Sequence, residues 1–529
     1  MRVSTLLPLV AAAPALALPS LFKPFTPPTE IATQAFDTAV SWVHSALSGA
    51  QNKWDDLETS ISGDLSVAKV QMNGIEYLSL THPAFPLHRL RVVKPELCDP
   101  NVNQLSGYLD ISESKHLFFW FQESRHKPSE DPVMLWLNGG PGCSSTTGLL
   151  FELGGCNIAD KGANVTYNEH SWNSVANVLY LDQPVGVGYS YSDSGEVNNS
   201  PAAAEDVYAF LSLFFSQYKE YAKQDFHISG ESYAGTYIPN IASVIYKNSL
   251  ALQSNLAPTP KLPVINLKSL LIGDGLTDPY NQFGSVPDWA CDKTKSPYAV
   301  YSDPEGAECV SLRAKAARCQ ALVSSCYKTG SRFSCVPANL YCFSGVFGDL
   351  QQLGYNVYDV RKKCDRSEDK DGPLCYKEMG WMETYLNTPE VKAELGAPDH
   401  ITFQSCNMNI NRNFLLQGDG MHDAASLLPA LIEDGIRVLI YAGEADMLVN
   451  FLGCEAVLDN LKTSYSGAFA KASKKDFVTT EGDVAGWTRD AGNVAFVAFH
   501  DAGHMVPHDD PVAALTMVKR WLKEKPLAK

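Results

Sequence analysis

Six short apolar runs constrain the fold of this chain more than any other feature of its sequence. Each run has the length of a strand and is bounded by turn residues. They lie at 133–137, 178–181, 226–229, 267–272, 438–442 and 494–499. Near-continuous apolar runs, rather than alternating ones, are typical of parallel strands buried on both faces. Helical patterns lie between some of them, such as the one behind Ser200-Pro201. The sequence therefore predicts an α/β fold with a mostly parallel central sheet covered by helices.

The remainder of the chain adds a hairpin and an insertion to this sheet. Residues 107–110 and 116–121 flank a short polar turn and predict an antiparallel hairpin. The strand pattern then lapses between about 280 and 415, where helical segments such as 309–325 alternate with loops. We interpret this stretch as a mostly helical insertion over the sheet. The pattern of strands resumes at Val438, and a final helix is expected over about 511–523.

Cysteines concentrate in the insertion. Eight of the thirteen lie between Cys291 and Cys375, and none has the Cys-x-x-Cys spacing of a structural zinc site, so neither a metal nor a cofactor is expected. In a chain that enters an oxidising compartment they indicate disulfides, although eight cysteines allow many pairings. Because thirteen is odd, at least one thiol must be free or bonded to another chain. Two sequons, at Asn164 and Asn198, are candidate glycosylation sites.

The N-terminal segments and the charge limit where the protein works. Residues 1–17 have the apolar run and small-residue ending of a cleaved signal peptide, and no later run is long enough to span a membrane. Residues 18–88 lack cysteine and begin with a Pro-rich stretch, which favours a pro-segment over N-terminal decoration of the mature protein. The net charge of −17, without a long Lys/Arg run, argues against nucleic acid as a partner.

The strongest motif surrounds Ser232. A predicted strand from Phe226 runs into the small residues Gly230 to Gly235, and a helix is expected to begin near Tyr237. Strand, tight turn and helix are the context of a nucleophile elbow, which holds a serine above the carboxyl edge of the sheet. The strict Gly-x-Ser-x-Gly pattern is broken here by Ala234.

A nucleophilic serine needs a histidine to take its proton and a carboxylate to orient that histidine. In α/β-hydrolases these residues follow the serine in the order acid, then histidine. Asp446 follows the run that ends at residue 442, and His504 follows the run that ends at residue 499. A loop-capping aspartate and a surface histidine are the alternative interpretations of the two. Nearby residues that compete for these roles are Glu444, His500 and His508.

A glycine-rich turn at 136–145 comes directly after the first of the six runs. Such a turn exposes backbone N–H groups, as an oxyanion hole requires. It lacks the lysine and the spacing of a phosphate-binding P-loop. We expect the N–H groups of Gly140 and Tyr233 to point at one spot beside Ser232.

These motifs together resemble those of the serine carboxypeptidases. The resemblance rests on the glycine turn, the 230–235 elbow, the segment Leu181-Asp182-Gln183-Pro184-Val185-Gly186 and the segment Gly503-His504-Met505-Val506-Pro507. It extends from about residue 95 to 523 and is greatest to the fungal vacuolar carboxypeptidase Y group. It implies an α/β-hydrolase fold with a helical, disulfide-rich insertion, and a catalytic domain over 89–529.

The resemblance also implies a substrate site. In this family a tryptophan, an asparagine, a glycine and two glutamates bind the C-terminal carboxylate; the matching residues are Trp136, Asn138, Gly139, Glu152 and Glu231. Two glutamates close to an anionic terminus cannot all stay ionised, so we expect a protonated pair and better cleavage at acidic pH. Side-chain pockets are implied at Thr147, Phe151 and Met505 for the departing residue, and at Tyr233, Leu276 and Phe283 for the preceding one. All six are equally compatible with plain core positions.

The disulfide pairs that the resemblance implies are Cys143–Cys406, Cys291–Cys309, Cys319–Cys342, Cys326–Cys335 and Cys364–Cys375. This pattern leaves Cys98, Cys156 and Cys454 without a partner. Some carboxypeptidase Y-like proteins carry a cysteine three residues after the triad aspartate. Val449 occupies that position here, so sensitivity to thiol reagents is not expected.

The resulting hypothesis is a serine-type carboxypeptidase that releases C-terminal amino acids from peptides and proteins through an acyl-enzyme, with broad specificity favouring hydrophobic residues. One alternative is an acyltransferase or esterase with the same triad. Another is a catalytically silent protective binding protein, although such relatives usually lose a triad member. The expected partners are peptides with free C-termini and the chain's own propeptide, without a membrane once the signal is removed. The vacuole lumen is the expected compartment, with the extracellular space as the alternative.

Overall fold

The computed structural model describes residues 66–528, apart from 73, 84, 194, 196, 254–261 and 368. The predicted signal peptide and the pro-segment up to residue 65 lie outside the described residues. No helix in the described part of the chain is both long and apolar enough to cross a membrane.

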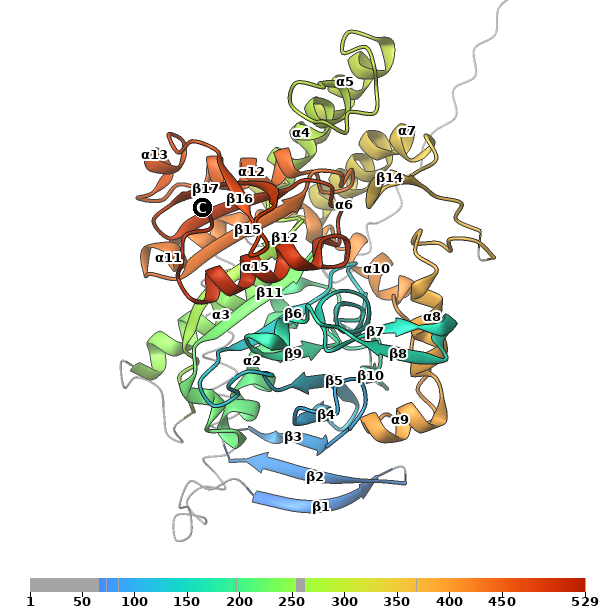
Figure 1. Ribbon diagram of the computed structural model, residues 1–529, viewed down its shortest axis with the longest axis vertical. Coiled ribbons are helices and arrows are strands. Elements are labelled where there is room, and N and C mark those ends of the chain that lie inside the picture. Colours follow the sequence, from blue (N-terminus) through green and yellow to red (C-terminus); the bar gives the residue numbers. More distant parts are fainter. Residues whose placement is uncertain are drawn as a thin grey trace, which may run out of the picture.

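Six parallel strands form the centre of the sheet, and they correspond to the six apolar runs (Figure 1). Their spatial order is β9 (Asn177–Leu181), β6 (Val133–Leu137), β11 (Phe226–Glu231), β12 (Leu267–Gly273), β15 (Arg437–Gly443) and β18 (Val494–Phe499). In β6, Val133, Leu135 and Leu137 join one buried cluster while Met134 and Trp136 join another. The predicted parallel sheet with two covered faces is therefore confirmed.

Antiparallel strands extend the sheet at both sides. On one side the order is β1 (Ser66–Met72), β2 (Ile75–His82), β3 (Phe85–Val93), β4 (Gln104–Ser112) and β5 (Lys115–Gln122), with β10 (Tyr191–Ser192) also on β5. On the other side lie β17 (Val484–Ala491) and β16 (Lys475–Val478). The β4–β5 hairpin was predicted, whereas β1 to β3 were not, and the expected boundary at residue 88 falls inside β3.

Helices cover both faces of the sheet. They are α2 (Ser200–Gln217), α3 (Ala234–Gln253), α11 (Leu428–Glu433), α12 (Phe451–Asn460), α13 (Ser466–Phe469), α14 (Val506–Asp509) and α15 (Pro511–Leu522). Helix α2 begins with Asn199 as its cap, whose side chain accepts from the Ala202 N–H, and with proline in its first turn. Both α2 and α15 lie where the sequence predicted them.

The predicted insertion is helical: in Figure 1 residues 279–351 lie toward the upper end of the molecule, and residues 378–415 lie along one side. Its helices are α4 (Pro279–Cys291), α5 (Ala307–Thr329), α6 (Arg332–Tyr341), α7 (Phe347–Gln351), α8 (Glu378–Leu386), α9 (Pro389–Leu395) and α10 (Met408–Leu415), with a small hairpin of β13 (Tyr355–Asn356) and β14 (Asp359–Lys363). Each of the five implied disulfide pairs is joined in the structure.

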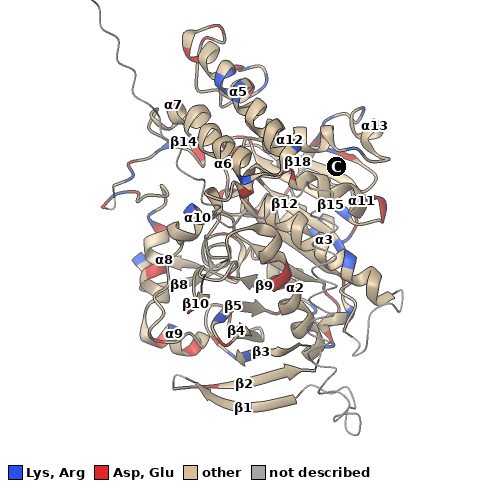
Figure 2. Cartoon of the chain, turned by 180° about the vertical axis from the view of Figure 1, so that it is seen from behind, with Lys and Arg blue, Asp and Glu red and all other residues tan. Residues whose placement is uncertain are grey.

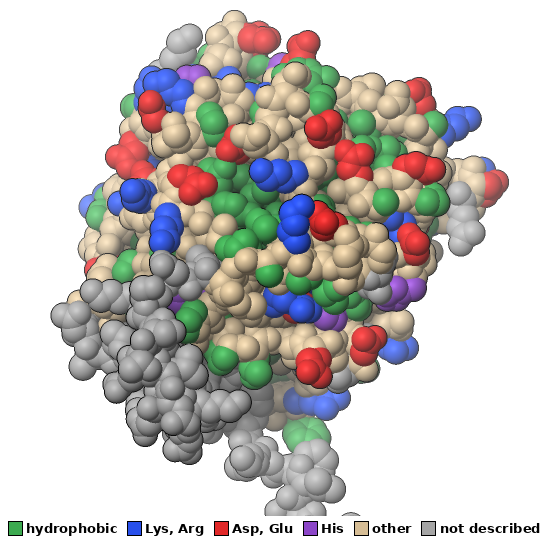
Figure 3. Space-filling model, turned by 90° about the horizontal axis from the view of Figure 1, so that it is seen from below, with side chains coloured by type: hydrophobic (Ala, Val, Ile, Leu, Met, Phe, Trp, Pro, Cys, Tyr) green, Lys and Arg blue, Asp and Glu red, His purple; other side chains and the backbone are tan. Residues whose placement is uncertain are grey.

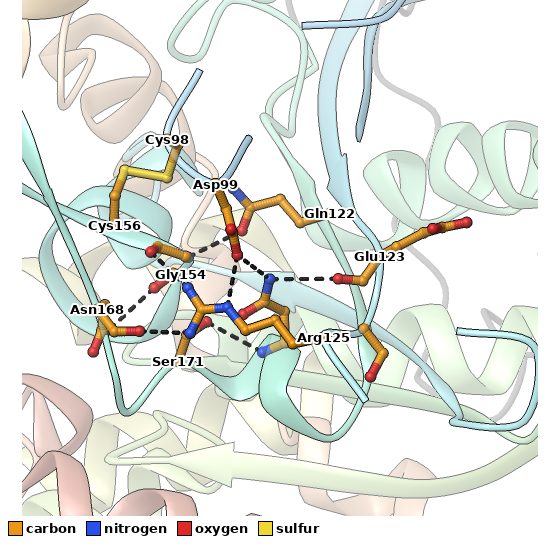
Figure 4. Close-up of polar contacts among 12 residues, drawn as sticks. Cys98, Asp99, Gln122, Glu123, Arg125, Gly154, Cys156, Asn168 and Ser171 are labelled. Atoms are coloured by element: carbon orange, nitrogen blue, oxygen red, sulfur yellow. Dashed lines mark hydrogen bonds and ion pairs between the residues drawn. A yellow bond between two sulfur atoms is a disulfide. The ribbon is translucent and has the colours of Figure 1, made fainter. Parts of the chain in front are cut away.

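A sixth disulfide joins Cys98 to Cys156, two cysteines for which the resemblance implied no partner. It links the segment before β4 to β7 (Cys156–Ala159), which pairs with β8 (Asn164–Tyr167). Figure 4 shows the polar network beside it, in which Arg125 Nε donates to Asp99 Oδ2 over 2.7 Å. Cys454 is a free, buried cysteine.

Charged residues lie mainly on outer helices and loops, such as α8, α9 and α3 (Figure 2). On the part of the surface uncovered in Figure 3, acidic and basic side chains are interspersed. That face therefore has no continuous basic footprint of the kind that nucleic acid requires.

Candidate active site

Ser232 lies in the tight turn between β11 and α3. Its backbone has φ 63°, in the left-handed region, and its N–H donates to Gly273 O over 3.0 Å. A Cβ on Gly230 would lie 2.3 Å from Leu137 O, so only glycine allows this close approach to β6. The helix begins at Ala234, three residues before the predicted start near Tyr237. The local sequence thus folds as a nucleophile elbow.

Asp446 and His504 come from loops at the same edge of the sheet as Ser232. Strands β11, β15 and β18 are parallel, so their carboxyl ends point the same way. His504 Nδ1 lies 2.6 Å from Asp446 Oδ2, and the Leu448 N–H donates to Asp446 Oδ1 over 2.8 Å. Both side chains are buried. This pair can therefore fix the ring of His504 in one orientation, as a serine nucleophile requires.

The competing residues have other partners. His500 Nδ1 lies 2.9 Å from Glu444 Oε2, and Glu444 also accepts from Trp487 Nε1. His508 Nδ1 lies 3.1 Å from the Phe151 carbonyl oxygen and its ring stacks on Phe151. These contacts favour Asp446 and His504 for the catalytic roles.

The glycine turn packs directly against the nucleophile turn. A Cβ on Gly139 would lie 2.3 Å from the Tyr233 backbone nitrogen and 2.8 Å from Ser232 Cβ. Within the described ranges, the N–H groups of Gly140 and Tyr233 donate to no protein acceptor. Two free donors in the turns beside Ser232 are thus available to form an oxyanion hole.

Asn138 connects the turn to both predicted glutamates. Its Nδ2 donates to Glu231 Oε1 over 3.0 Å and to Glu152 Oε1 over 3.2 Å. Its Oδ1 accepts from Trp136 Nε1 over 2.8 Å and from the Gly148 N–H over 2.9 Å, which fixes which way the amide points. The structure thus brings four of the five implied carboxylate-binding side chains together.

The two glutamates form a buried acid pair. Glu231 ends β11 and Glu152 lies in the π-helical segment Gly148–Leu153, and both side chains are buried. Burial raises the pKa of Glu152 to about 7. Burial, and next the charge of Glu152, raise the pKa of Glu231 well above its ordinary value. Both carboxyl groups accept from the same Asn138 amide, and like charges held this close in a buried site favour a proton on at least one of them.

An apolar cavity opens beside Ser232. It is lined by Gly140, Ser232, Tyr233, Leu276, Gln282, Phe283, Phe343, Phe347, Leu448, Val449 and Asn450. Tyr233, Leu276 and Phe283 were predicted to line such a pocket. Thr147, Phe151 and Met505 are buried outside this lining.

The sequence did not point to Phe343 and Phe347. Both belong to the insertion, and their rings lie 5.3 and 5.6 Å from the ring of Phe283. Their spacing of four residues in a predicted helical region was a signal for a shared helix face. The spacing could not indicate that this helix face packs against Phe283 and lines the cavity beside Ser232.

The two candidate glycosylation sites differ in exposure. Asn164 and Thr166 are exposed on β8, whereas Asn198 is half-buried just before α2. The hydroxyl of Ser200 in the second sequon donates to Asp419 Oδ2 over 2.6 Å. Asn164 is therefore the more accessible of the two in the folded chain.

Comparison with known proteins gives one consistent result. The serine carboxypeptidase family matches residues 95–524. The chain is 47% identical to a carboxypeptidase Y homolog A of Leptosphaeria maculans, over 80% of this chain and 73% of that protein. It is 48% identical to the one of Neurospora crassa, over 82% and 74%. The solved structure of a prohormone-processing carboxypeptidase from Saccharomyces cerevisiae shares the α/β-hydrolase fold, with a TM-score of 0.68, 24% identity and coverage of 82% and 94%.

Proposed function

Because this chain belongs to the serine carboxypeptidase family and is a serine-type carboxypeptidase, we propose that Ser232, His504 and Asp446 perform its chemistry and that Glu152 and Glu231 select the free C-terminus. The observation that carries this proposal is the bridge made by Asn138. Its amide holds both buried glutamates beside the turn that bears Ser232.

Acylation begins when Ser232 Oγ attacks the carbonyl carbon of the last peptide bond and His504 takes the hydroxyl proton. The Asp446 carboxylate, 2.6 Å from His504 Nδ1, stabilises the imidazolium that forms. The N–H groups of Gly140 and Tyr233 stabilise the oxyanion; loss of one such donor typically costs about 3 kcal/mol. Collapse breaks the C–N bond, and His504 gives its proton to the departing amine.

Deacylation repeats these steps with water. His504 takes a proton from the water molecule that attacks the ester carbonyl, and the same oxyanion hole stabilises the second tetrahedral intermediate. Collapse returns the proton to Ser232 Oγ and releases the shortened peptide. The products are one free amino acid and a peptide that is one residue shorter.

The glutamate pair supplies hydrogen-bond donors to the substrate carboxylate. A protonated carboxyl group can donate, whereas an ionised one repels an anion. Since the pKa of Glu152 is about 7, the pair retains its donors at acidic pH and loses the first of them as pH rises through 7. We therefore propose an acidic optimum for peptide cleavage.

The apolar cavity accounts for the preference for hydrophobic residues. Phe283, Phe343 and Phe347 present aromatic surface to the space next to Ser232, and burial of an apolar side chain there removes area from water. We assign this cavity to the residue that precedes the scissile bond.

The precursor and its destination complete the proposal. We propose a signal peptide at 1–17, a propeptide over 18–88 that binds the catalytic domain before activation, and a glycoprotein that carries a glycan at Asn164. The secretory pathway suits the six disulfides, and the vacuole lumen is the compartment that we propose.

Digestion of one peptide in two forms tests this function. The peptide with a free C-terminus and its C-terminal amide are incubated at pH 5 and pH 8, and products are resolved by mass. We expect stepwise loss of single residues from the free peptide, faster at pH 5, and none with Ser232→Ala. Ser302→Ala, at an exposed position, is the matched control and should digest normally. Equal trimming of the amide would refute the role of the glutamate pair, and trimming by Ser232→Ala would refute the triad.

A further inference from the structure

A buried acid that the mechanism above does not use lies at the catalytic edge of the sheet, next to the triad. Asp274 is the first residue after β12, between the strands that lead to Ser232 and to Asp446. Its side chain is fully buried and its backbone has φ 41°, in the left-handed region. Its N–H donates to Tyr441 O over 2.8 Å, which fixes it beside β15.

The carboxyl group of Asp274 contacts the triad aspartate. The Gly443 N–H donates to Asp274 Oδ1 over 3.0 Å, and the carboxyl group of Asp274 lies beside that of Asp446, with which it interacts electrostatically. Side-chain atoms of Asp274, Asp446 and His504 all lie within 4.8 Å of one another. Two carboxyl groups can form a hydrogen bond only if one of them carries a proton.

The surroundings of Asp274 decide which carboxyl group holds that proton. The titratable groups that face it are Glu231 on β11, Tyr441 on β15, Asp446, His504 and the Cys454 thiol on α12. Burial, and next the charge of Asp446, raise the pKa of Asp274 well above its ordinary value, while the Gly443 N–H opposes this rise. Asp446, by contrast, faces the imidazole of His504 and accepts the Leu448 N–H.

On the premise of the triad assigned above, we propose that Asp274 is a positioning residue: it keeps its proton while the enzyme works, and its O–H donates a hydrogen bond that holds Asp446 in the orientation facing His504. The Asp446 carboxylate is then held by three groups, namely the imidazole, the Leu448 N–H and the Asp274 hydroxyl. Asp274 itself touches neither substrate nor Ser232 in this role.

Asparagine is the informative replacement. Its side-chain oxygen can accept from the Gly443 N–H and its amide can donate to Asp446, so Asp274→Asn reproduces the protonated state at every pH. Asp274→Ala removes the donor, also without a charge. Asp490→Asn, at an exposed position on β17, is the matched control for loss of one carboxylate.

The readout is the rate at which diisopropyl fluorophosphate labels Ser232, followed from pH 4 to 9. In this reaction Ser232 Oγ displaces fluoride from phosphorus and His504 takes the hydroxyl proton. The reagent has no carboxylate, so Glu152 and Glu231 do not enter through substrate binding. In the plot of labelling rate against pH, the midpoint of the acid limb reports protonation of the triad histidine. The rate on the plateau above it reports how well that histidine is positioned.

We expect the same midpoint in wild type and in Asp274→Asn, because no charge is lost. The plateau should fall by roughly 10- to 150-fold in Asp274→Ala, the effect of losing one hydrogen bond to a charged group, and asparagine should restore most of it. A midpoint lower by half a pH unit or more in Asp274→Asn alone would show that Asp274 is an anion and would overturn the proposal. An undiminished plateau in Asp274→Ala would also overturn it.

Two further controls separate this inference from the proposed function. Thermal unfolding by circular dichroism checks that Asp274→Ala is folded; if it is not, the midpoint for Asp274→Asn still decides the charge of Asp274. If wild type is not labelled at Ser232, the proposed function fails and this inference fails with it. If wild type is labelled normally but the pH midpoint of labelling is lower in Asp274→Asn, only the role of Asp274 is refuted and the proposed function stands.

Discussion

The replacement Glu152→Gln isolates the titration that should govern substrate affinity. In wild type, burial raises the pKa of Glu152 to about 7. If only the protonated pair binds a peptide carboxylate, KM scales as one plus the ratio of ionised to protonated Glu152. That ratio is about 0.01 at pH 5 and about 10 at pH 8, so KM should rise about 11-fold between them. A glutamine donates its N–H at both pH values, and its oxygen can still accept from Asn138.

The assay is the initial rate of release of the C-terminal residue from an N-blocked dipeptide, with KM and kcat determined separately at each pH. We expect Glu152→Gln to keep KM within about twofold from pH 5 to 8, since one amide replaces the titrating group. Glu130→Gln, at an exposed glutamate, should reproduce the wild-type rise. Tightest wild-type binding near pH 8, or an 11-fold rise that persists in Glu152→Gln, would refute this reasoning.

Three other predictions concern the cavity, the sixth disulfide and the N-terminal strands. Phe343→Ala should lower kcat/KM for peptides with a penultimate Phe or Leu by roughly 10-fold, which corresponds to about 1–2 kcal/mol of apolar contact. The kcat/KM for peptides with a penultimate Ala should not change. An equal loss for both kinds of peptide would contradict the assigned pocket. Replacement of both Cys98 and Cys156 by Ala should lower the free energy of unfolding in urea by about 4 kcal/mol, from a loop of 58 residues; an unchanged midpoint would contradict this. After a cut near residue 89, residues 66–88 should stay bound to the rest of the chain, because β2 pairs with the part of β3 beyond the cut. The fragment should therefore co-elute with the catalytic domain in gel filtration and separate from it only in denaturant.

The central sheet was predictable because its signal is local. A strand buried on both faces must be apolar throughout, so each of the six runs can be recognised from its own residues, without knowledge of the strand beside it. The order of serine, acid and histidine then places three side chains at one edge, because parallel strands end on the same side. Asp446 and His504 were predicted this way, and the structure places His504 Nδ1 2.6 Å from Asp446 Oδ2.

The features that were missed depend on partners far away in the chain. Strand β1 has no buried residue, and β2 and β3 mix buried with exposed positions. We assigned most of these strands to a pro-segment because the region lacks cysteine and begins with a Pro-rich stretch. Cys98 and Cys156 are 58 residues apart, and nothing in that spacing indicates that they meet. Asp274 did carry a usable signal: an acidic residue directly after a predicted strand lies at the same edge as Asp446.

The two acid pairs at this edge of the sheet share the same electrostatics, but we propose different roles for them. Glu152 with Glu231, and Asp274 with Asp446, each place two interacting carboxyl groups in a buried site. Burial and like charge favour at least one proton per pair, which converts an acid into a hydrogen-bond donor. We propose that the donor of the first pair binds the substrate carboxylate and that the donor of the second binds the carboxylate of Asp446. In our proposal the first pair loses a proton as pH rises through the pKa of Glu152, about 7, which weakens peptide binding. Burial and the charge of Asp446 raise the pKa of Asp274 well above its ordinary value, so we propose that it keeps its proton while the enzyme works. A substrate without a carboxylate should therefore be processed at an alkaline pH at which peptides are no longer bound.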